Sequence, residues 1–166
     1  QLKTIHLIIL LFFCFSFSCT DKRINEFDNL ELKVNKFTNS ELQKIYNFQN
    51  ERNTKELLKF FEHPELICRE ASILAMASVQ DTIAIINLID ALINEKSIKI
   101  RMAAAFSIGQ TGSKIAEIAL LNAFRKENSN KVKVKILESI GKCGSDTGLM
   151  FLANIVDTSK DSAILN

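Results

Sequence analysis

Few residues of this sequence have the type and spacing that catalysis or metal binding requires. His63 is the only histidine after residue 18, and it stands directly before Pro64. Serine catalysis needs a base beside its nucleophile, and a metal site needs several ligands, so a single histidine supports neither. We therefore expect no catalytic residue, no metal site and no cofactor, and we interpret His63 as a surface loop or helix-end residue.

The glycines Gly109 and Gly112 have a spacing found in some phosphate-binding loops. The Lys and Ser or Thr that follow such a loop are missing here, and no strand pattern precedes it. Glycine reaches left-handed backbone conformations without a clash, which suits the end of a helix. We interpret this pair, and Gly141 with Gly144, as helix ends that allow a tight reversal.

The first 18 residues have the pattern of an export signal. Lys3 precedes an apolar run of 13 positions at 5–17, and the small residue Ser18 stands before Cys19. A membrane-spanning helix needs about 20 apolar residues, whereas this order and length fit a cleaved signal peptide. We predict a signal peptide at 1–18 followed by a polar tether at 19–37.

The segment Ser16-Phe17-Ser18-Cys19 resembles the lipobox of bacterial lipoproteins. The resemblance implies lipidation of Cys19, which becomes the mature N-terminus, and two acyl chains give stable attachment to a membrane. It also implies a place in the bacterial cell envelope, with the chain exported and facing the periplasm. Cleavage without lipidation and a membrane-spanning anchor remain the alternatives.

From residue 38 onward the spacing of apolar residues is helical. Ser40 with Gln43, and Asn53 with Glu56, fit capping boxes ahead of apolar positions. Pro64 then ends the second of these helices. No strand-like alternation appears in residues 38–157, so we predict an all-α domain.

An internal repeat with an offset of 32 residues is the strongest signal in the chain. It aligns Arg69 with Arg101 and Lys133, and it also aligns the apolar residues Met76, Ile108 and Ile140, and Leu88, Leu120 and Leu152. Each unit contains two helical stretches, at 69–79 and 82–93, 101–109 and 114–125, and 133–141 and 146–156. Residues on the inward faces should be buried between layers: Ala104, Ala105, Ile108, Leu120, Leu121, Ile136, Ile140 and Leu152.

Residues 100–112 resemble the second helix of the short HEAT-like repeat first noted in phycobilin lyases. The resemblance implies a right-handed α-solenoid with repeats at about 69–93, 101–125 and 133–157, within a domain at 38–166. That family usually has an Asp about seven positions before the repeated Arg. Here Glu62, Asn94 and Lys126 stand there, so a regular ladder of Asp and Arg is not expected. The family is specific for architecture and says little about function.

Cys68 and Cys143 are the two cysteines that remain in the domain. They fall two repeats apart and at opposite ends of their helices, which implies a separation of roughly 18 Å for layers about 8 to 10 Å apart. A disulfide tolerates at most about 7 Å between Cα atoms. We predict two free, buried thiols.

The charge of the chain gives no sign of a nucleic-acid partner. It has 21 basic and 19 acidic residues, a net charge of +2, which falls to +1 without residues 1–18. Binding to nucleic acid needs a clustered basic face. We expect neither nucleic acid nor a small-molecule cofactor as a partner.

The second helices of a HEAT-like stack line its concave face, so their outward stripes are the candidate binding surface. Leu74 and Phe106 are apolar at equivalent positions, and Met102 adjoins them. The hypothetical partner-binding residues are Glu70, Leu74, Met102, Phe106, Gln110, Glu138 and Lys142. An apolar patch with such a polar rim suits a protein or an extended peptide. The alternative is that another part of the chain, or a downstream domain, covers it.

The order of the segments gives a second, narrower resemblance. The sequence has a lipoprotein signal, then three short motifs, and then HEAT-like repeats. The motifs are Asn35-Lys36-Phe37-Thr38, Tyr46-Asn47-Phe48-Gln49 and Arg52-Asn53-Thr54. This order is similar to the amino-terminal part of bacterial envelope proteins that end in a cyclophilin-type peptidyl-prolyl isomerase domain. Two hypotheses remain: a non-enzymatic interaction or scaffolding module held at the membrane, and the recognition part of a longer isomerase whose catalytic domain is absent from this chain.

Overall fold

The computed structural model describes residues 38–158, and all regular structure within this range is helical. The predicted all-α class is therefore confirmed. The predicted signal peptide, Cys19 and the tether lie outside the described residues. The elements are α3 (Ser40–Asn50), α4 (Thr54–Lys59), η1 (Phe60–Glu62), α5 (Leu66–Val79), η2 (Thr82–Ala84), α6 (Ile85–Asn94), α7 (Ile98–Thr111), η3 (Lys114–Ala116), α8 (Glu117–Lys126), α9 (Asn130–Cys143) and α10 (Asp146–Thr158); those written η are 3₁₀ helices.

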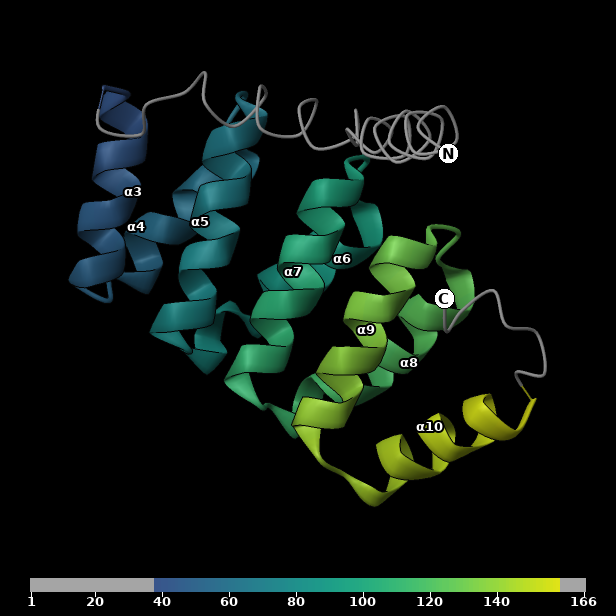
Figure 1. The fold of residues 1–166 in the computed structure, drawn as a ribbon. Coiled ribbons are helices and arrows are strands. Elements are labelled where there is room, and N and C mark those ends of the chain that lie inside the picture. The colour runs from purple at the N-terminus through teal and green to yellow at the C-terminus, as the bar shows by residue number, and fades with distance from the viewer. Residues whose placement is uncertain (1–37, 159–166) are drawn as a thin grey trace, which may run out of the picture. The chain divides into compact units, whose positions relative to one another are not determined.

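The described helices form pairs that follow one another along the chain (Figure 1). The long helices α5, α7 and α9 pack side by side in chain order, with α3 on the outer side of α5. The shorter helices α4, α6 and α8 lie in a second layer, and each contacts the long helix that follows it. Each pair buries its apolar faces against its neighbours, so the core is continuous from α3 to α10.

The first two helices begin at asparagine caps. The side chain of Asn39 accepts hydrogen bonds from the backbone N–H groups of Glu41 and Leu42, at 2.9 and 3.1 Å. The prediction that Ser40 caps this helix is therefore wrong by one residue. The predicted cap at Asn53 is confirmed, because its side chain accepts the N–H of Glu56 at 3.3 Å.

The long helices begin three residues earlier than the sequence analysis predicted, at Leu66, Ile98 and Asn130. The repeated basic residue, at which the sequence predicts the start of each helix, follows the first turn of the helix in the structure. All three end at a left-handed residue: Gln80 with φ 55°, Gly112 with φ 60° and Gly144 with φ 63°. The helix-end prediction is confirmed for these two glycines.

Gly109, by contrast, does not end a helix. It is buried inside α7, where an added Cβ would lie 2.7 Å from Ser139 Oγ and 2.9 Å from its Cα. Its missing side chain is what allows α7 and α9 to approach closely. The sequence interpretation of Gly109 as part of a helix end is therefore wrong, and so is that of Gly141, which lies inside α9.

Buried serine hydroxyls join successive long helices at equivalent positions. Ser107 donates to the carbonyl oxygen of Ile73 at 2.7 Å, and Ser139 donates to that of Ala105 at 2.6 Å. Donors and acceptors are each related by the 32-residue offset. Burying a hydroxyl without a partner is unfavourable, so these bonds favour one register between the helices.

The predicted core is buried at seven of eight positions; Leu152 is the exception and is half-buried. Leu152 belongs to α10, which is the last described helix and does not continue the layer of α6 and α8 in their direction (Figure 1). Its equivalents Leu88 and Leu120 are fully buried. Within residues 38–158, no further helix follows α10 that could bury the open side of Leu152.

Among the helices that the structure describes, none is long and apolar enough to cross a membrane.

Candidate partner-binding surface

The predicted binding residues lie on α5, α7 and α9, and we call this set the long-helix face. Leu74 on α5 is 39% exposed, and Val134 on α9, which also faces outward, is 40% exposed. Glu138 and Lys142 are exposed as well, whereas the other four members are half-buried: Glu70, Met102, Phe106 and Gln110. The face is thus a partly open apolar strip rather than a fully exposed one.

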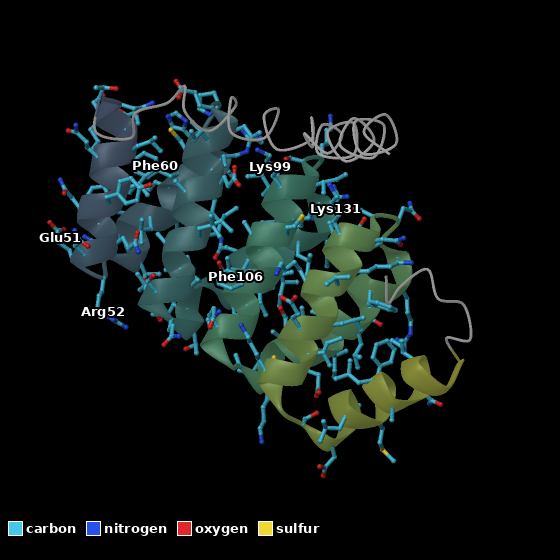
Figure 2. All side chains as sticks on the ribbon, viewed as in Figure 1. Glu51, Arg52, Phe60, Lys99, Phe106 and Lys131 are labelled. Carbon is cyan, nitrogen blue, oxygen red and sulfur yellow. The ribbon has the colours of Figure 1, made fainter. Side chains whose placement is uncertain are left out.

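Charged side chains from α9 border this strip. The ammonium group of Lys142 lies 5.2 Å from the centre of the Phe106 ring, at the distance of a cation–π contact. Glu138 pairs with Lys135 at 2.8 Å within the same helix. Figure 2 shows Phe106 on α7 and Lys131 at the start of α9. A ligand on Phe106 would have to displace or share the contact with Lys142.

A second apolar surface, which the sequence analysis did not identify, lies on the short helices. Ile83 in η2 and Ile86 at the start of α6 are 73% and 79% exposed, and Ile115 in η3 and Ile118 at the start of α8 are 82% and 70% exposed. We call these four residues the isoleucine ridge. They are about twice as exposed as Leu74 or Val134. Burying one of these side chains would therefore remove more apolar surface from water and be more favourable.

The sequence did contain a signal for this ridge. Ile83 aligns with Ile115, and Ile86 aligns with Ile118, at the same 32-residue offset that revealed the repeat. The resemblance places binding on the long helices, so only their outward residues were considered as a binding surface. The repeated isoleucines of the short helices would have indicated the ridge.

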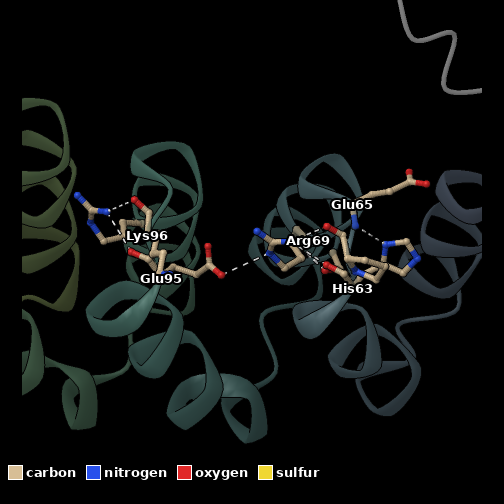
Figure 3. Close-up of polar contacts among 8 residues, drawn as sticks. His63, Glu65, Arg69, Glu95 and Lys96 are labelled. Carbon is tan, nitrogen blue, oxygen red and sulfur yellow. Dashed lines mark hydrogen bonds and ion pairs between the residues drawn. The ribbon is translucent and has the colours of Figure 1, made fainter.

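Arg69 and Arg101 form two equivalent ion pairs with Glu95 and Glu127, which we call the arginine–glutamate ladder. It differs from the regular ladder of Asp and Arg, which the sequence does not predict. The guanidinium of Arg69 lies 3.4 Å from the carboxylate of Glu95 (Figure 3). Arg101 makes two hydrogen bonds with Glu127, at 2.8 and 3.1 Å. The family pattern predicts an acid before the arginine, whereas each acid here follows its arginine by 26 residues and lies directly after the next short helix, α6 or α8.

The second of these ion pairs is the more enclosed. The Glu127 side chain is 7% exposed and also accepts the N–H groups of Asn128 and Ser129. Its hydrogen bonds with Arg101 hold the pKa of Glu127 below its usual range, against the opposing effect of burial, and the Ser129 N–H adds to the decrease. Arg101 also donates to the carbonyl oxygens of Glu95 and Lys96, which fixes the loop between α6 and α7.

Two hollows open beside these ion pairs at equivalent places in successive units. One, of about 570 Å³, contains Arg101 and Glu127, with Ile93 and Ile98 on its wall. The other, of about 410 Å³, contains Arg69 with His63 and Asp90. The arginines are already engaged by carboxylates and carbonyl groups, so both hollows belong to the structural ladder.

Two further predictions concern single residues. Cys68 and Cys143 are free and buried, as predicted. Burial raises the pKa of Cys68 to about 11, helped by the nearby Glu65, and burial also raises the pKa of Cys143. His63 lies at the end of η1, where it stacks on Phe60 at 5.8 Å and its Nδ1 accepts the N–H of Glu65. The predicted helix-end role of His63 is confirmed.

Within the described part of the chain, no three His, Cys, Asp or Glu residues are placed to hold a metal ion. The fold defines an all-α protein of repeated helix pairs. No protein-family model matches the sequence, and no curated protein matches it. The two apolar surfaces are therefore the basis for a functional proposal.

Proposed function

We propose that this chain is a non-enzymatic interaction or scaffolding module built of HEAT-like helix pairs in a right-handed α-solenoid. The observation that carries the proposal is the exposed apolar strip of the long-helix face, bordered by Glu138 and Lys142. Apolar residues with a charged rim are typical of surfaces that bind proteins. An extended peptide or a protein segment is the partner class that such a strip fits.

The strip has two features of a peptide-binding groove. Leu74 and Val134 are accessible without any rearrangement, while Phe106 becomes more accessible when Lys142 moves to pair with an acidic group of the ligand. Successive long helices lie about 8 to 10 Å apart, which matches about three residues of an extended chain. Because side chains alternate between the two faces of an extended strand, a peptide in the polyproline II conformation, which has three residues per turn, is the form that would place every third side chain over a helix.

Replacement of Leu74 and Val134 by Glu tests the surface. The double variant should lose capture of the proteins that the wild-type chain retains from envelope extracts, with an unchanged thermal midpoint, because exposed substitutions change stability by about 0.5 kcal/mol or less. The matched control is Ile83→Glu with Ile115→Glu, which adds the same charges on the isoleucine ridge. A folded Leu74 and Val134 variant that captures the same proteins as the wild type would refute the assignment.

Leu74→Glu with Phe106→Glu asks whether the half-buried ring belongs to the binding surface or to the core. We expect this variant to stay folded and to lose capture. Unfolding would show that Phe106 is a core residue and would remove it from the surface.

We further propose that Cys19 carries the lipid that tethers the module to a membrane of the bacterial envelope, facing the periplasm. The support is the resemblance of Ser16-Phe17-Ser18-Cys19 to a lipobox. Cys19→Ala should abolish both membrane fractionation and labelling with a palmitate analogue. Cys14→Ala is the control and should change neither. Labelling that persists in Cys19→Ala would refute the lipid assignment.

The order of segments favours a second candidate function, the recognition part of a peptidyl-prolyl isomerase. Its support is the similarity of residues 35–54 and the repeats to the amino-terminal part of such envelope proteins. Sequencing the gene downstream of the codon for Asn166 tests it directly. A β-rich segment of cyclophilin size would support this candidate, and a stop codon there would refute it.

A further inference from the structure

We propose that two copies of this chain associate through the isoleucine ridge, with α6 of one copy packed on α8 of the other. Ile83 in η2 and Ile86 in α6 are exposed where η2 leads into α6, and Ile115 in η3 and Ile118 in α8 are exposed where η3 leads into α8. Clustered apolar side chains this exposed are uncommon on a monomer and typically mark an interface. The inference does not depend on the long-helix face and goes beyond the proposed peptide binding.

The repeat gives the ridge the symmetry that a dimer needs. In a two-fold dimer the same patch is used on both copies, so its two halves must fit each other. A two-fold axis that lies in the contact plane and runs between α6 and α8, parallel to them, places α6 on α8 of the second copy. Ile83 then meets Ile115 of the second copy, and Ile86 meets Ile118 of the second copy.

The charges on the two helices favour this pairing over the alternatives. Asp90 is the one charged residue of α6. The exposed charged residues of α8 are Arg125 and Lys126, because Glu117 is buried. With the axis parallel to the helices, packing α6 on α6 would bring Asp90 toward its own copy, and packing α8 on α8 would bring bases together. Only α6 on α8 brings opposite charges to the same place.

Asp90 and Arg125 also lie on the sides of α6 and α8 that this pairing brings together. Asp90 borders the hollow that contains His63, on the side of α6 that faces α4. Arg125 lies 5.6 Å from the ring of Phe151 in α10, on the opposite outer side of α8. A two-fold axis between α6 and α8 superimposes these outer flanks. Arg125 is three residues past Asn122, the equivalent of Asp90, so its long side chain reaches back one turn to the carboxylate.

The size of the surface indicates a modest affinity. The segment formed by η2 and α6 is about 20 Å long, and the neighbouring helix lies about 8 to 10 Å away. A standard interface takes about 800 Å² from each partner, and this face is at or below that size. We expect a dissociation constant of about 1 to 100 µM.

Sedimentation equilibrium of the full 166-residue chain in mild detergent tests the dimer across that concentration range. The wild-type mass should rise from one copy to two, and Ile86→Glu with Ile118→Glu should remain at one copy. Leu74→Glu with Val134→Glu is the matched control and should associate as the wild type does. A wild-type chain that stays at one copy throughout would overturn the proposal, as would unchanged association of the Ile86 and Ile118 variant.

Charge reversal tests the pairing of Asp90 with Arg125. Because the pair occurs twice in the dimer, Asp90→Arg or Arg125→Asp alone should raise the dissociation constant about tenfold, and the two together should restore it to within about threefold. Lys131→Asp is the control, since Lys131 lies at the start of α9 (Figure 2). Failure of the combined variant to recover would overturn this pairing.

Disulfide cross-linking distinguishes the possible axes. A mixture of Ile86→Cys and Ile118→Cys chains should form covalent dimers faster than either variant alone. The wild-type chain gives the background, and its Cys68 and Cys143 are buried. Faster cross-linking of Ile86→Cys with itself would show α6 packed on α6 and would overturn the proposed arrangement.

Discussion

The pair formed by α7 and α8 and the pair formed by α9 and α10 have similar sequences but different surroundings. Gly109 is buried against Ser139, whereas its equivalent Gly141 is exposed. Leu120 is fully buried, whereas its equivalent Leu152 is half-buried. The difference arises because α9 covers α7, while no described helix lies in the same way on α9.

This difference shows what a repeat sequence determines and what it leaves to position. The apolar pattern within a unit selects the residues that face inward, because helical periodicity acts locally. Whether an inward residue is covered depends on the next unit, since each unit of a repeat array contacts only its neighbours. Substitutions at equivalent positions should therefore have unequal effects in the two pairs.

The largest difference is expected for the two leucines. Leu120→Ala should lower the free energy of unfolding by about 2 to 5 kcal/mol, because it leaves a cavity in a closed core. Leu152→Ala should lower it by about 1 kcal/mol, because a half-buried side chain loses less contact on truncation. Urea unfolding followed by circular dichroism measures both. Equal losses would show that α10 is covered as fully as α8.

The glycines give the next largest difference, and here the two effects should have opposite signs. Gly109→Ala should be destabilising by about 1 to 3 kcal/mol, because its methyl group would overlap the backbone of Ser139. Gly141→Ala should be stabilising by up to about 1 kcal/mol, because alanine favours the helix and its methyl group meets only Leu152 at 3.9 Å. Thermal unfolding of both variants checks the signs. A neutral Gly109→Ala would mean that α7 and α9 separate easily.

Much of the fold could be predicted from the sequence because its signals are local. The periodicity and the 32-residue offset predicted the helix pairs, and Gly112 and Gly144 marked helix ends through their backbone freedom. The cap was misplaced because Asn39 and Ser40 are both good capping residues. When two neighbouring residues can both cap a helix, the packing of the folded helix decides which of them does so.

The contacts between helices were harder to predict. Glu95 and Glu127 repeat at the same offset as their arginines, yet which acid each arginine reaches depends on how the end of each short helix lies against the long helices beside it. The ridge was missed for a related reason, since Ile83 and Ile115 look like core residues by type. Their repetition at the 32-residue offset indicates a shared role, and the folded surface shows that both face water.

The ion-pair ladder gives a third comparison between the pairs. Arg101→Met should lower the free energy of unfolding by about 1 to 2 kcal/mol at pH 7, because it removes two hydrogen bonds to the Glu127 carboxylate. Lys133→Met, at the equivalent position, should lower it by about 0.5 kcal/mol, since the Lys133 ammonium group lies 5.6 Å from the centre of the Phe124 ring and has no ion pair with a carboxylate of the described residues. Urea unfolding of the two variants measures the difference.

The pH dependence of the Arg101 effect has a definite sign. The pKa of Glu127 is lowered in the folded chain, so its contribution is present above the unfolded value of about 4.3 and is lost as the pH falls through the folded value. The gap between the wild type and Arg101→Met should therefore narrow below about pH 4. A gap that stays constant between pH 7 and pH 3 would contradict the ionic origin of the effect.

The smallest expected difference is at the two left-handed glycines, where the pairs should behave alike. Gly112 and Gly144 have φ of 60° and 63°, and an added Cβ would meet nothing within 4 Å at Gly112 and only the carbonyl oxygen of Lys142, at 3.9 Å, at Gly144. Gly112→Ala and Gly144→Ala should each be destabilising by about 1 kcal/mol, because the strain lies in the backbone of the residue itself. Their effects on the free energy of unfolding should agree within about 0.5 kcal/mol. A clearly smaller effect at Gly144 would show that the last pair unfolds separately from the rest of the stack, since local strain could then be released without unfolding α7.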